Sequence, residues 1–285
     1  YEINIGDWSS DVCSSDLRKM NPQHFRNISL GLRSIRIVAN NEWRAFVHNK
    51  GLLLSMFMQP LITYGLLVMA LNQNLASVHY ESLILPYKQY ALTGVLSFFM
   101  TTQMSQAMYR ATVDKEYGLL AIKFTNGVQP WHYLTGMSFF PIAGLLFQSA
   151  VLIVLGLATG GVYNLGLLLL SLLVLIISLE FWSTLGIVLS TRISSYQQRD
   201  IIMTLIFSPV AYAAPTLYVF SNNSPLIIKV LAYINPLSYQ LKALRTVAFG
   251  IFNINDLLIA LVLTIIMIIF AQIILRRMPL SLAER

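Results

Sequence analysis

Six long stretches of mostly apolar residues run along the chain, separated by shorter polar segments. They cover residues 51–71, 90–109, 134–158, 165–189, 201–220 and 257–275. A helix needs about 20 apolar residues to cross the hydrocarbon core of a membrane. Runs of this length without strict alternation are typical of helices rather than of barrel strands. The pattern therefore predicts six transmembrane helices.

The segment before the first stretch has a different, helical periodicity. Its apolar residues recur at steps of three or four: Phe25, Ile28, Leu32, Ile35, Ala39, Trp43 and Phe46. Most of its arginines fall off this stripe, which predicts an amphipathic helix lying along the inner membrane surface. We expect residues 18–50 to form either a plain juxtamembrane anchor or an elbow that also braces a cytoplasmic partner.

Prolines interrupt the pattern near the carboxyl end of the chain. The fifth stretch contains Pro209 and Pro215, each of which removes a backbone donor and kinks the helix. The following segment, NNSPLIIKVLAYINPLSYQLKALRTVAFG, is apolar but is broken by Pro225 and Pro236. It predicts short interfacial or re-entrant helices on the outer side, before the last span.

Composition supports a membrane protein. Hydrophobic residues make up 56% of the chain and charged residues 11%, whereas soluble domains have about 25% charged residues. The predicted fold class is an all-α, polytopic membrane protein, with a six-helix domain at 51–278 and a cytoplasmic tail at 279–285.

The first 17 residues do not fit this picture. Residues 7–17 read DWSSDVCSSDL, which corresponds codon by codon to the translation of a common short-read sequencing adapter. We expect residues 1–17 not to be native, and the first native residue to be Met20. Leaving them out removes four acids and no base, which raises the formal net charge from +7 to +11. It also removes Cys13, the only cysteine.

Lysine and arginine set the expected orientation. With six spans, 15 of the 19 basic residues fall on the side that holds both chain ends, and four fall on the other. Because cytoplasmic segments carry the excess of lysine and arginine, both termini are predicted to be cytoplasmic. The loop between the second and third spans is then cytoplasmic as well.

Motifs for chemistry are missing from the sequence. It contains no phosphate-binding loop, no H-E-x-x-H pair and no G-x-S-x-G elbow, and its four histidines are scattered. We therefore expect no enzyme activity, cofactor or metal in this chain. The only acid within a span is Glu180, which is expensive to bury in lipid. It could be a substrate or gating contact, or a hydrogen-bonded structural group.

Two segments resemble a known family. The cytoplasmic loop carries Glu116–Tyr117–Gly118 followed by Leu119–Leu120, and the carboxyl part has a proline-broken fifth helix, then Asn235–Pro236–Leu237, then Arg245. This order resembles the permease subunits of type-2 ABC exporters, the class that exports drugs, lipids and polysaccharides. The resemblance covers Phe25–Arg277.

The resemblance implies roles for several residues. The loop would form a short helix that docks into a groove of an ATP-binding subunit, with coupling residues Asp114, Lys115, Glu116, Tyr117, Gly118 and Leu119. The carboxyl-terminal signature would comprise Pro209, Pro215, Asn235, Pro236, Leu237 and Arg245. The coupling segment is more apolar than the family's pattern, at Ala121–Ile122 and Phe124.

The resemblance also implies the partners. Two permeases, identical or different, would pair in the cytoplasmic (inner) membrane, in contact with lipid, and nucleic acid is not expected. ATP and Mg²⁺ would bind to separate ATP-binding cassette subunits on the cytoplasmic face. The expected cargo is a small amphipathic molecule, drug-like or lipid-like. The alternatives are an ATP-independent secondary transporter or channel, and an exporter of polysaccharide.

Overall fold

The structure is a computed structural model that describes residues 30–73, 75–161, 163–193, 195–219 and 225–278. The proposed adapter segment 1–17, Met20 and the tail 279–285 lie outside the described residues. So do Phe25 and Ile28 of the predicted amphipathic stripe.

The described chain is mainly helical. Its amino-terminal half contains, in order, α2 (Arg33–His48), α3 (Lys50–Pro60), the π-helix η2 (Leu61–Val68), α4 (Met69–Asn72), β1 (Ser77–Tyr80), β2 (Leu83–Pro86), α5 (Tyr87–Glu116), α6 (Leu119–Thr125) and α7 (Pro130–Met137). Its carboxyl-terminal half contains α8 (Phe139–Ala158), α9 (Leu165–Ser190), α10 (Tyr196–Ile202), the π-helix η3 (Met203–Phe207), α11 (Ser208–Ala213), α12 (Leu226–Ile234), α13 (Pro236–Ala248) and α14 (Ile254–Arg277).

Within the described residues, four helical stretches are long and apolar enough to cross a membrane: Lys50–Asn72, Pro130–Ala158, Leu165–Ser190 and Ile254–Arg277. They correspond to the first, third, fourth and sixth predicted spans. The second predicted span lies within α5 and the fifth begins in α10, so both are also helical. The all-α, polytopic fold class is confirmed, while the total of six spans stays a prediction.

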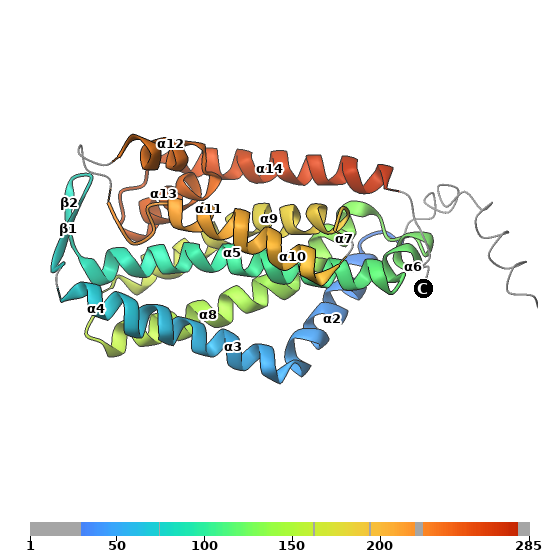
Figure 1. Ribbon diagram of the computed structural model, residues 1–285, viewed down its shortest axis with the longest axis horizontal. Helices are drawn as coiled ribbons and strands as arrows, with labels where there is room; N and C mark the ends of the chain where they lie inside the picture. Colours follow the sequence, from blue (N-terminus) through green and yellow to red (C-terminus); the bar gives the residue numbers. More distant parts are fainter. Residues whose placement is uncertain (1–29, 74, 162, 194, 220–224, 279–285) are drawn as a thin grey trace, which may run out of the picture.

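The long helices run side by side along the longest axis of the molecule, with α5 among them (Figure 1). Helix α5 packs against α8, α9 and α13, and much of its surface is buried. One close approach depends on Gly94, because a Cβ there would lie 1.7 Å from the carbonyl oxygen of Thr216. Helix α6 lies at one end of the bundle, and β1, β2, α12 and α13 lie at or near the other.

Three glutamines connect the helices inside the bundle. The Gln103 side chain of α5 donates to Gln148 of α8 over 2.8 Å, and Gln148 donates to Gln59 of α3 over 2.8 Å. Amide side chains that bond between helices stabilise their association in an apolar environment. This chain of amides links α3 to α8, and α8 to α5.

The fifth predicted span differs from the structure at both ends. Its helix begins at Tyr196 and ends at Ala213, whereas residues 201–220 were expected. The helix ends because Pro215 has no backbone N–H and because the residue before a proline disfavours helical geometry. Ala214 is accordingly extended, with φ −71° and ψ 145°.

A small hairpin precedes α5 and was not expected from the sequence. Strands β1 and β2 pair antiparallel, with Ser77 opposite Pro86 and Tyr80 opposite Leu83. Glu81, in the two-residue turn, has a positive φ of 51°. The hairpin was missed because strands of only four residues give a weak sequence signal, even though Ser77–Tyr80 alternates between polar and apolar residues.

Helix α2 presents a different face to the protein than the apolar stripe predicted. Its inward positions are Ser34, Val38, Glu42 and Phe46, spaced by four residues, together with Ala39. Leu32 and Trp43 of the predicted stripe are exposed. The predicted helix is thus present. Its apolar residues lie on two faces, one packed against the bundle and one pointing outward. Its position at the membrane surface stays a prediction.

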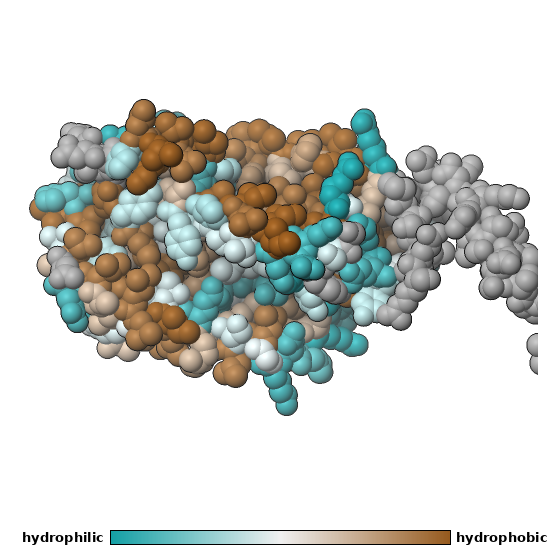
Figure 2. Space-filling model, in the orientation of Figure 1, coloured by the Kyte–Doolittle hydropathy of each residue, from teal (hydrophilic) through white to brown (hydrophobic). Residues whose placement is uncertain are grey.

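The surface divides into regions of different polarity (Figure 2). Hydrophobic residues cover much of the visible flank of the long helices, and hydrophilic residues gather towards the end where α6 lies. This distribution suits a bundle whose flank faces lipid and whose end faces water.

Candidate coupling site

The expected coupling segment lies at a sharp turn between two helices. Helix α5 ends at Glu116, and Gly118 has a φ of +68° before α6 begins at Leu119. The turn is closed by hydrogen bonds from Tyr117 N to Val113 O and from Gly118 N to Lys115 O, both 3.1 Å. Left-handed backbone suits glycine because a Cβ is strained there. Gly118 therefore sets the direction in which α6 leaves α5.

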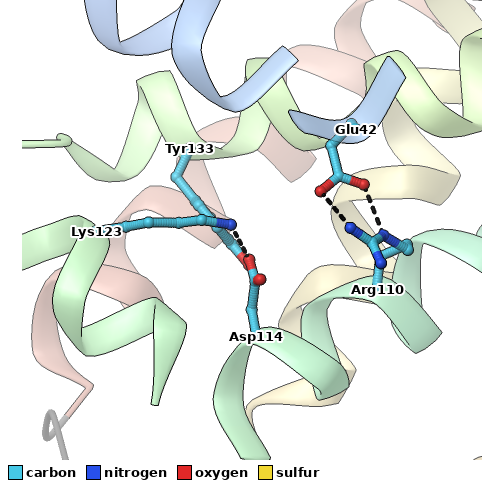
Figure 3. A network of polar contacts seen from close by, with 5 residues as sticks. All are labelled: Glu42, Arg110, Asp114, Lys123 and Tyr133. Atoms are coloured by element: carbon cyan, nitrogen blue, oxygen red, sulfur yellow. Dashed lines mark hydrogen bonds and ion pairs between the residues drawn. The ribbon is translucent and has the colours of Figure 1, made fainter. Parts of the chain in front are cut away.

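A buried carboxylate anchors α6 behind this turn (Figure 3). Asp114 of α5 is 2% exposed and forms an ion pair with Lys123 of α6. The hydroxyl of Tyr133, in α7, donates to Asp114 Oδ2 over 2.9 Å. The Lys123 ammonium also lies 5.4 Å from the centroid of the Tyr133 ring, a cation–π distance. One carboxylate thus holds three helices together.

A second ion pair joins α2 to α5 (Figure 3). Glu42 is fully buried and accepts two hydrogen bonds from Arg110, from Nε over 2.8 Å and from Nη2 over 2.9 Å. Such two-point pairing fixes orientation as well as distance. The sequence reading missed Glu42, although its four-residue spacing from Val38 and Phe46 could have placed it on a buried helix face.

Lys115 joins α5 to the end of α9. Its ammonium donates to the backbone carbonyls of Thr191 and Ile193, each over 3.0 Å, and to Ser190 over 3.5 Å. These carbonyls follow the last turn of a helix and have no partner within it. Burial lowers the pKa of Lys115, which lies outside the predicted span 90–109. Lys115 was expected to contact a partner protein, but it forms hydrogen bonds within this chain.

The outward side of the turn is apolar. Tyr117 is 61% exposed, Leu119 41% and Ile122 46%. We call these three residues the coupling face. Two of them were expected as coupling residues, whereas Ile122, one helical turn after Leu119, was noted only as an apolar position beyond the motif. Of the other predicted residues, Asp114 and Lys115 point inward, and Glu116 is half-buried.

The residues of the expected carboxyl-terminal signature meet at the opposite end of the bundle. Asn235 begins α13 by accepting a hydrogen bond from Leu237 N over 3.0 Å, while its amide donates to Val210 O over 2.6 Å. Val210 is near the proline-broken end of α11, where backbone acceptors lack helical partners. Pro236 occupies the first turn of α13, and Pro209 the first turn of α11.

Arg245 completes this arrangement. Its guanidinium donates to Pro215 O over 2.9 Å and to Thr216 O over 3.0 Å. It also donates to the hydroxyls of Tyr90 and Thr93 on α5, over 2.9 and 3.1 Å. Arg245 thus donates to backbone carbonyls that have no helical partner, because the helix ends before Pro215. It also joins this segment to α5.

Glu180 has a hydrogen-bonded position inside the bundle. Ser138, between α7 and α8, donates to Glu180 Oε2 over 2.8 Å and lies 3.0 Å from the Ser183 hydroxyl. Of the two sequence-based interpretations, this contact favours the hydrogen-bonded structural group.

The Glu42–Arg110 pair yields a first prediction. We expect Glu42→Gln to lower the stability of the solubilised protein by about 2–3 kcal/mol, because it leaves a half-buried guanidinium with a weaker partner. Thermal unfolding followed by intrinsic fluorescence would measure the loss. The exchange of the two residues, Glu42→Arg with Arg110→Glu, should recover part of it.

Glu81→Gln is the matched control, because Glu81 forms a weak ion pair. Its carboxylate is partly exposed and lies as far as 3.9 Å from the Lys242 ammonium. Such surface pairs contribute about 0–1 kcal/mol. Equal transition temperatures for Glu42→Gln and Glu81→Gln would show that the buried pair has no special role.

Comparison with known proteins identifies the family. A family model described as ABC-2 type transporter matches residues 33–249. The match begins in α2 and extends into the end of α13, so it contains both ion pairs, the coupling face and the Arg245 cluster. No curated protein sequence matches the chain. Because the match covers more than half of the chain, this protein belongs to the ABC-2 type transporters, as a membrane-embedded transporter subunit.

Proposed function

We propose that this chain is the permease subunit of an ATP-driven exporter. In this proposal two permeases, identical or different, pair in the cytoplasmic membrane, and an ATP-binding subunit docks on each. The excess of lysine and arginine on one side supports a cytoplasmic position for α6 and both chain ends in this proposal. ATP and Mg²⁺ bind to the partner subunits, and this chain supplies the route across the membrane.

The coupling face is the observation that carries the proposal. Three large apolar side chains stand exposed on a turn whose backbone and inner side are rigidly held. An exposed apolar cluster on a polar end of a protein is typical of an interaction site. The ATP-binding subunit is its proposed occupant, since the family implies pairing with such a subunit.

The buried contacts behind the face provide a route for force. A push on α6 reaches α5 and α7 through the cluster of Lys123, Asp114 and Tyr133, and it reaches α9 through Lys115. Packed interiors change between discrete arrangements rather than deforming smoothly. Closure of the ATP-binding subunits would then rock these helices together and open the route outward.

The cargo is proposed to be a small amphipathic molecule, drug-like or lipid-like. Support comes from the far end of the bundle, where the described connections are a short hairpin and the helices α12 and α13. These short elements surround a cavity of small-molecule size, about 630 Å³. The ATP-driven mechanism is preferred to a secondary transporter because of the family match.

Cross-linking tests the docking. In a Cys13→Ser background, Tyr117→Cys should form a cross-link to the ATP-binding subunit that co-purifies with the chain, seen as a new band at the summed mass. Tyr239→Cys, a tyrosine at the opposite end, is the matched control and should not react with that subunit. If Tyr117→Cys gives no cross-link while the two subunits co-purify, the coupling face is not their contact.

A further inference from the structure

A cavity of about 630 Å³ lies at the end of the bundle opposite the coupling face. Its walls come from the β1–β2 hairpin, from the segment after the Pro215 break, from α12 and α13, and from Tyr90 of α5. The volume falls within the range of about 300–1,000 Å³ that is usual for small-molecule sites. Its size alone does not indicate a ligand, but the charge of its walls does.

Arg245 brings a buried positive charge to this cavity. It is 1% exposed, and its guanidinium lies 3.7 Å from the centroid of the Tyr90 ring. Its hydrogen-bond acceptors are carbonyl and hydroxyl oxygens, all of them neutral. Among the described residues no carboxylate forms an ion pair with it. The charge therefore remains uncompensated in a region of low dielectric, where its field is weakly screened.

The other charged side chains at the cavity wall leave it with a net positive charge. Lys229 and Lys242 also line the cavity, and Glu81 is the one acid among the described residues that line it. Lys242 is 45% exposed and lies 3.1 Å from Asp256, behind the wall. When Asp256 is included, three cations still face two acids. The cavity thus attracts an anion.

Ser238 adds a hydrogen-bonding group without a partner. Its hydroxyl oxygen is buried, belongs to a residue that lines the cavity, and has no hydrogen-bond partner among the described residues. Buried hydroxyls in folded proteins normally have one. The neighbouring Tyr239 hydroxyl, by contrast, donates to Tyr233 O over 2.8 Å. A rotation of this side chain towards the cavity lets Ser238 donate to a ligand oxygen.

Part of the wall is apolar. Val219, Ala232 and Leu241 line the same cavity, and α12 carries large exposed hydrophobic side chains at Leu226 and Ile227 beside it. A ligand that satisfies both parts of the wall has an anionic head and an apolar body. An inorganic anion would leave the apolar part unused.

We propose that this cavity binds amphiphiles with a single carboxylate or phosphate head, and that these are the substrate class of the transporter. The head lies near Lys229 and Ser238, in the field of Arg245, and the apolar body lies along Val219, Ala232 and Leu241. This inference rests on the proposed function in one respect. Only if the chain is an exporter does the cavity serve as an exit site for its cargo.

Binding of a charged fluorescent amphiphile, compared with its neutral analogue, tests the inference. The probe is 11-(dansylamino)undecanoic acid, and its primary amide is the neutral partner. Both are titrated onto the full chain in nanodiscs of phosphatidylcholine, with empty nanodiscs as the baseline. We expect saturable binding of the acid and at least about tenfold weaker binding of the amide, the usual order for loss of one charge-assisted contact. Inorganic phosphate at millimolar concentration should not displace the acid.

Three variants locate the site. Lys229→Gln should weaken binding of the acid about tenfold and leave binding of the amide unchanged. Ser238→Ala should weaken binding of the acid by a smaller factor than Lys229→Gln does. Lys88→Gln is the matched control, because Lys88 is a cation at the same end of the molecule that donates to Thr159 O and does not line the cavity. It should bind the acid as the unchanged chain does.

The outcomes separate this inference from the proposed function. Equal binding of acid and amide, or equal loss in Lys229→Gln and Lys88→Gln, overturns the anionic site even if the ATP-binding subunit co-purifies and cross-links. If the chain binds the acid selectively but no ATP-binding subunit co-purifies with it, the anionic site is supported and the proposed exporter function is rejected. Selective binding without stimulation of partner ATP hydrolysis by the acid overturns its role as substrate.

Discussion

Gly118→Val is expected to leave the protein in the membrane at normal level and to abolish substrate-stimulated ATP hydrolysis by the assembled transporter. Gly118 has a φ of +68°, where a residue with a side chain is strained by about 1–2 kcal/mol. A β-branched residue relieves that strain by changing the turn, which turns α6 and the coupling face away from their partner. The measurement is ATP hydrolysis of the reconstituted complex with and without substrate.

Gly160→Val is the matched control for backbone strain. Gly160 also has a positive φ, +76°, and nothing lies within 4 Å of the Cβ that valine would add. It carries a comparable conformational cost at the far end of the bundle, so stimulated hydrolysis should persist. If both variants retain stimulation, the direction of α6 does not matter for coupling.

Glu116→Lys complements this test by changing charge rather than shape. Glu116 is half-buried beside the coupling face, and its carboxylate raises the pKa of Lys115, against the larger effect of burial. The reversal places a second cation beside Lys115 and alters the charge offered to the partner. We expect weaker co-purification of the ATP-binding subunit, with membrane insertion unaffected.

Arg245→Ala is expected to have the largest effect on stability of any single substitution at the far end of the bundle. It leaves Thr216 O without its donor, and it removes the charged donor of Pro215 O and of the Tyr90 hydroxyl, which keep only the contacts of Tyr90 with Pro215 O and Tyr218 O. Each buried polar group that loses such a partner costs about 1–3 kcal/mol. A total of at least about 3 kcal/mol should lower the melting temperature by roughly 10 °C in a protein of this size. Thermal unfolding of the solubilised chain measures it.

Lys242→Ala provides the comparison on the same helix, one turn earlier. Its ammonium is about half exposed, and such ion pairs contribute about 0–1 kcal/mol. Arg245→Lys should fall between the two, since it keeps the charge but loses the planar set of donors. A melting temperature for Arg245→Ala within a degree or two of that for Lys242→Ala would contradict the role assigned to Arg245.

The sequence predicted what depends on local pattern. Long apolar runs located the helices, and the Glu116–Gly118 motif located the turn before α6, whereas Pro215 was expected to kink a span that reached residue 220 and instead follows its end at Ala213. These signals are local because helix length, proline geometry and the glycine turn are properties of neighbouring residues.

The orientation of side chains was not predictable in this way. Lys115 was expected to meet a partner protein, but it bonds to carbonyls about 75 residues later in the chain. Arg245 was named from the resemblance, yet its partners on α5 are more than 150 residues away in sequence. Which face of a helix is covered depends on contacts of this kind, and no local pattern encodes them.

The uninterrupted length of α5 links the two ends of the molecule mechanically. This one helix carries Asp114 and Lys115 at the coupling end, and Tyr90 and Thr93 at the Arg245 end. Thr93 and Asp114 are 21 residues apart, about 32 Å along a helix axis. A lever of that length moves its far end by about 3 Å when it tilts by roughly 5°. That displacement equals the length of the Arg245 hydrogen bonds, so a tilt of α5 that starts at one end is large enough to remodel the cavity wall at the other.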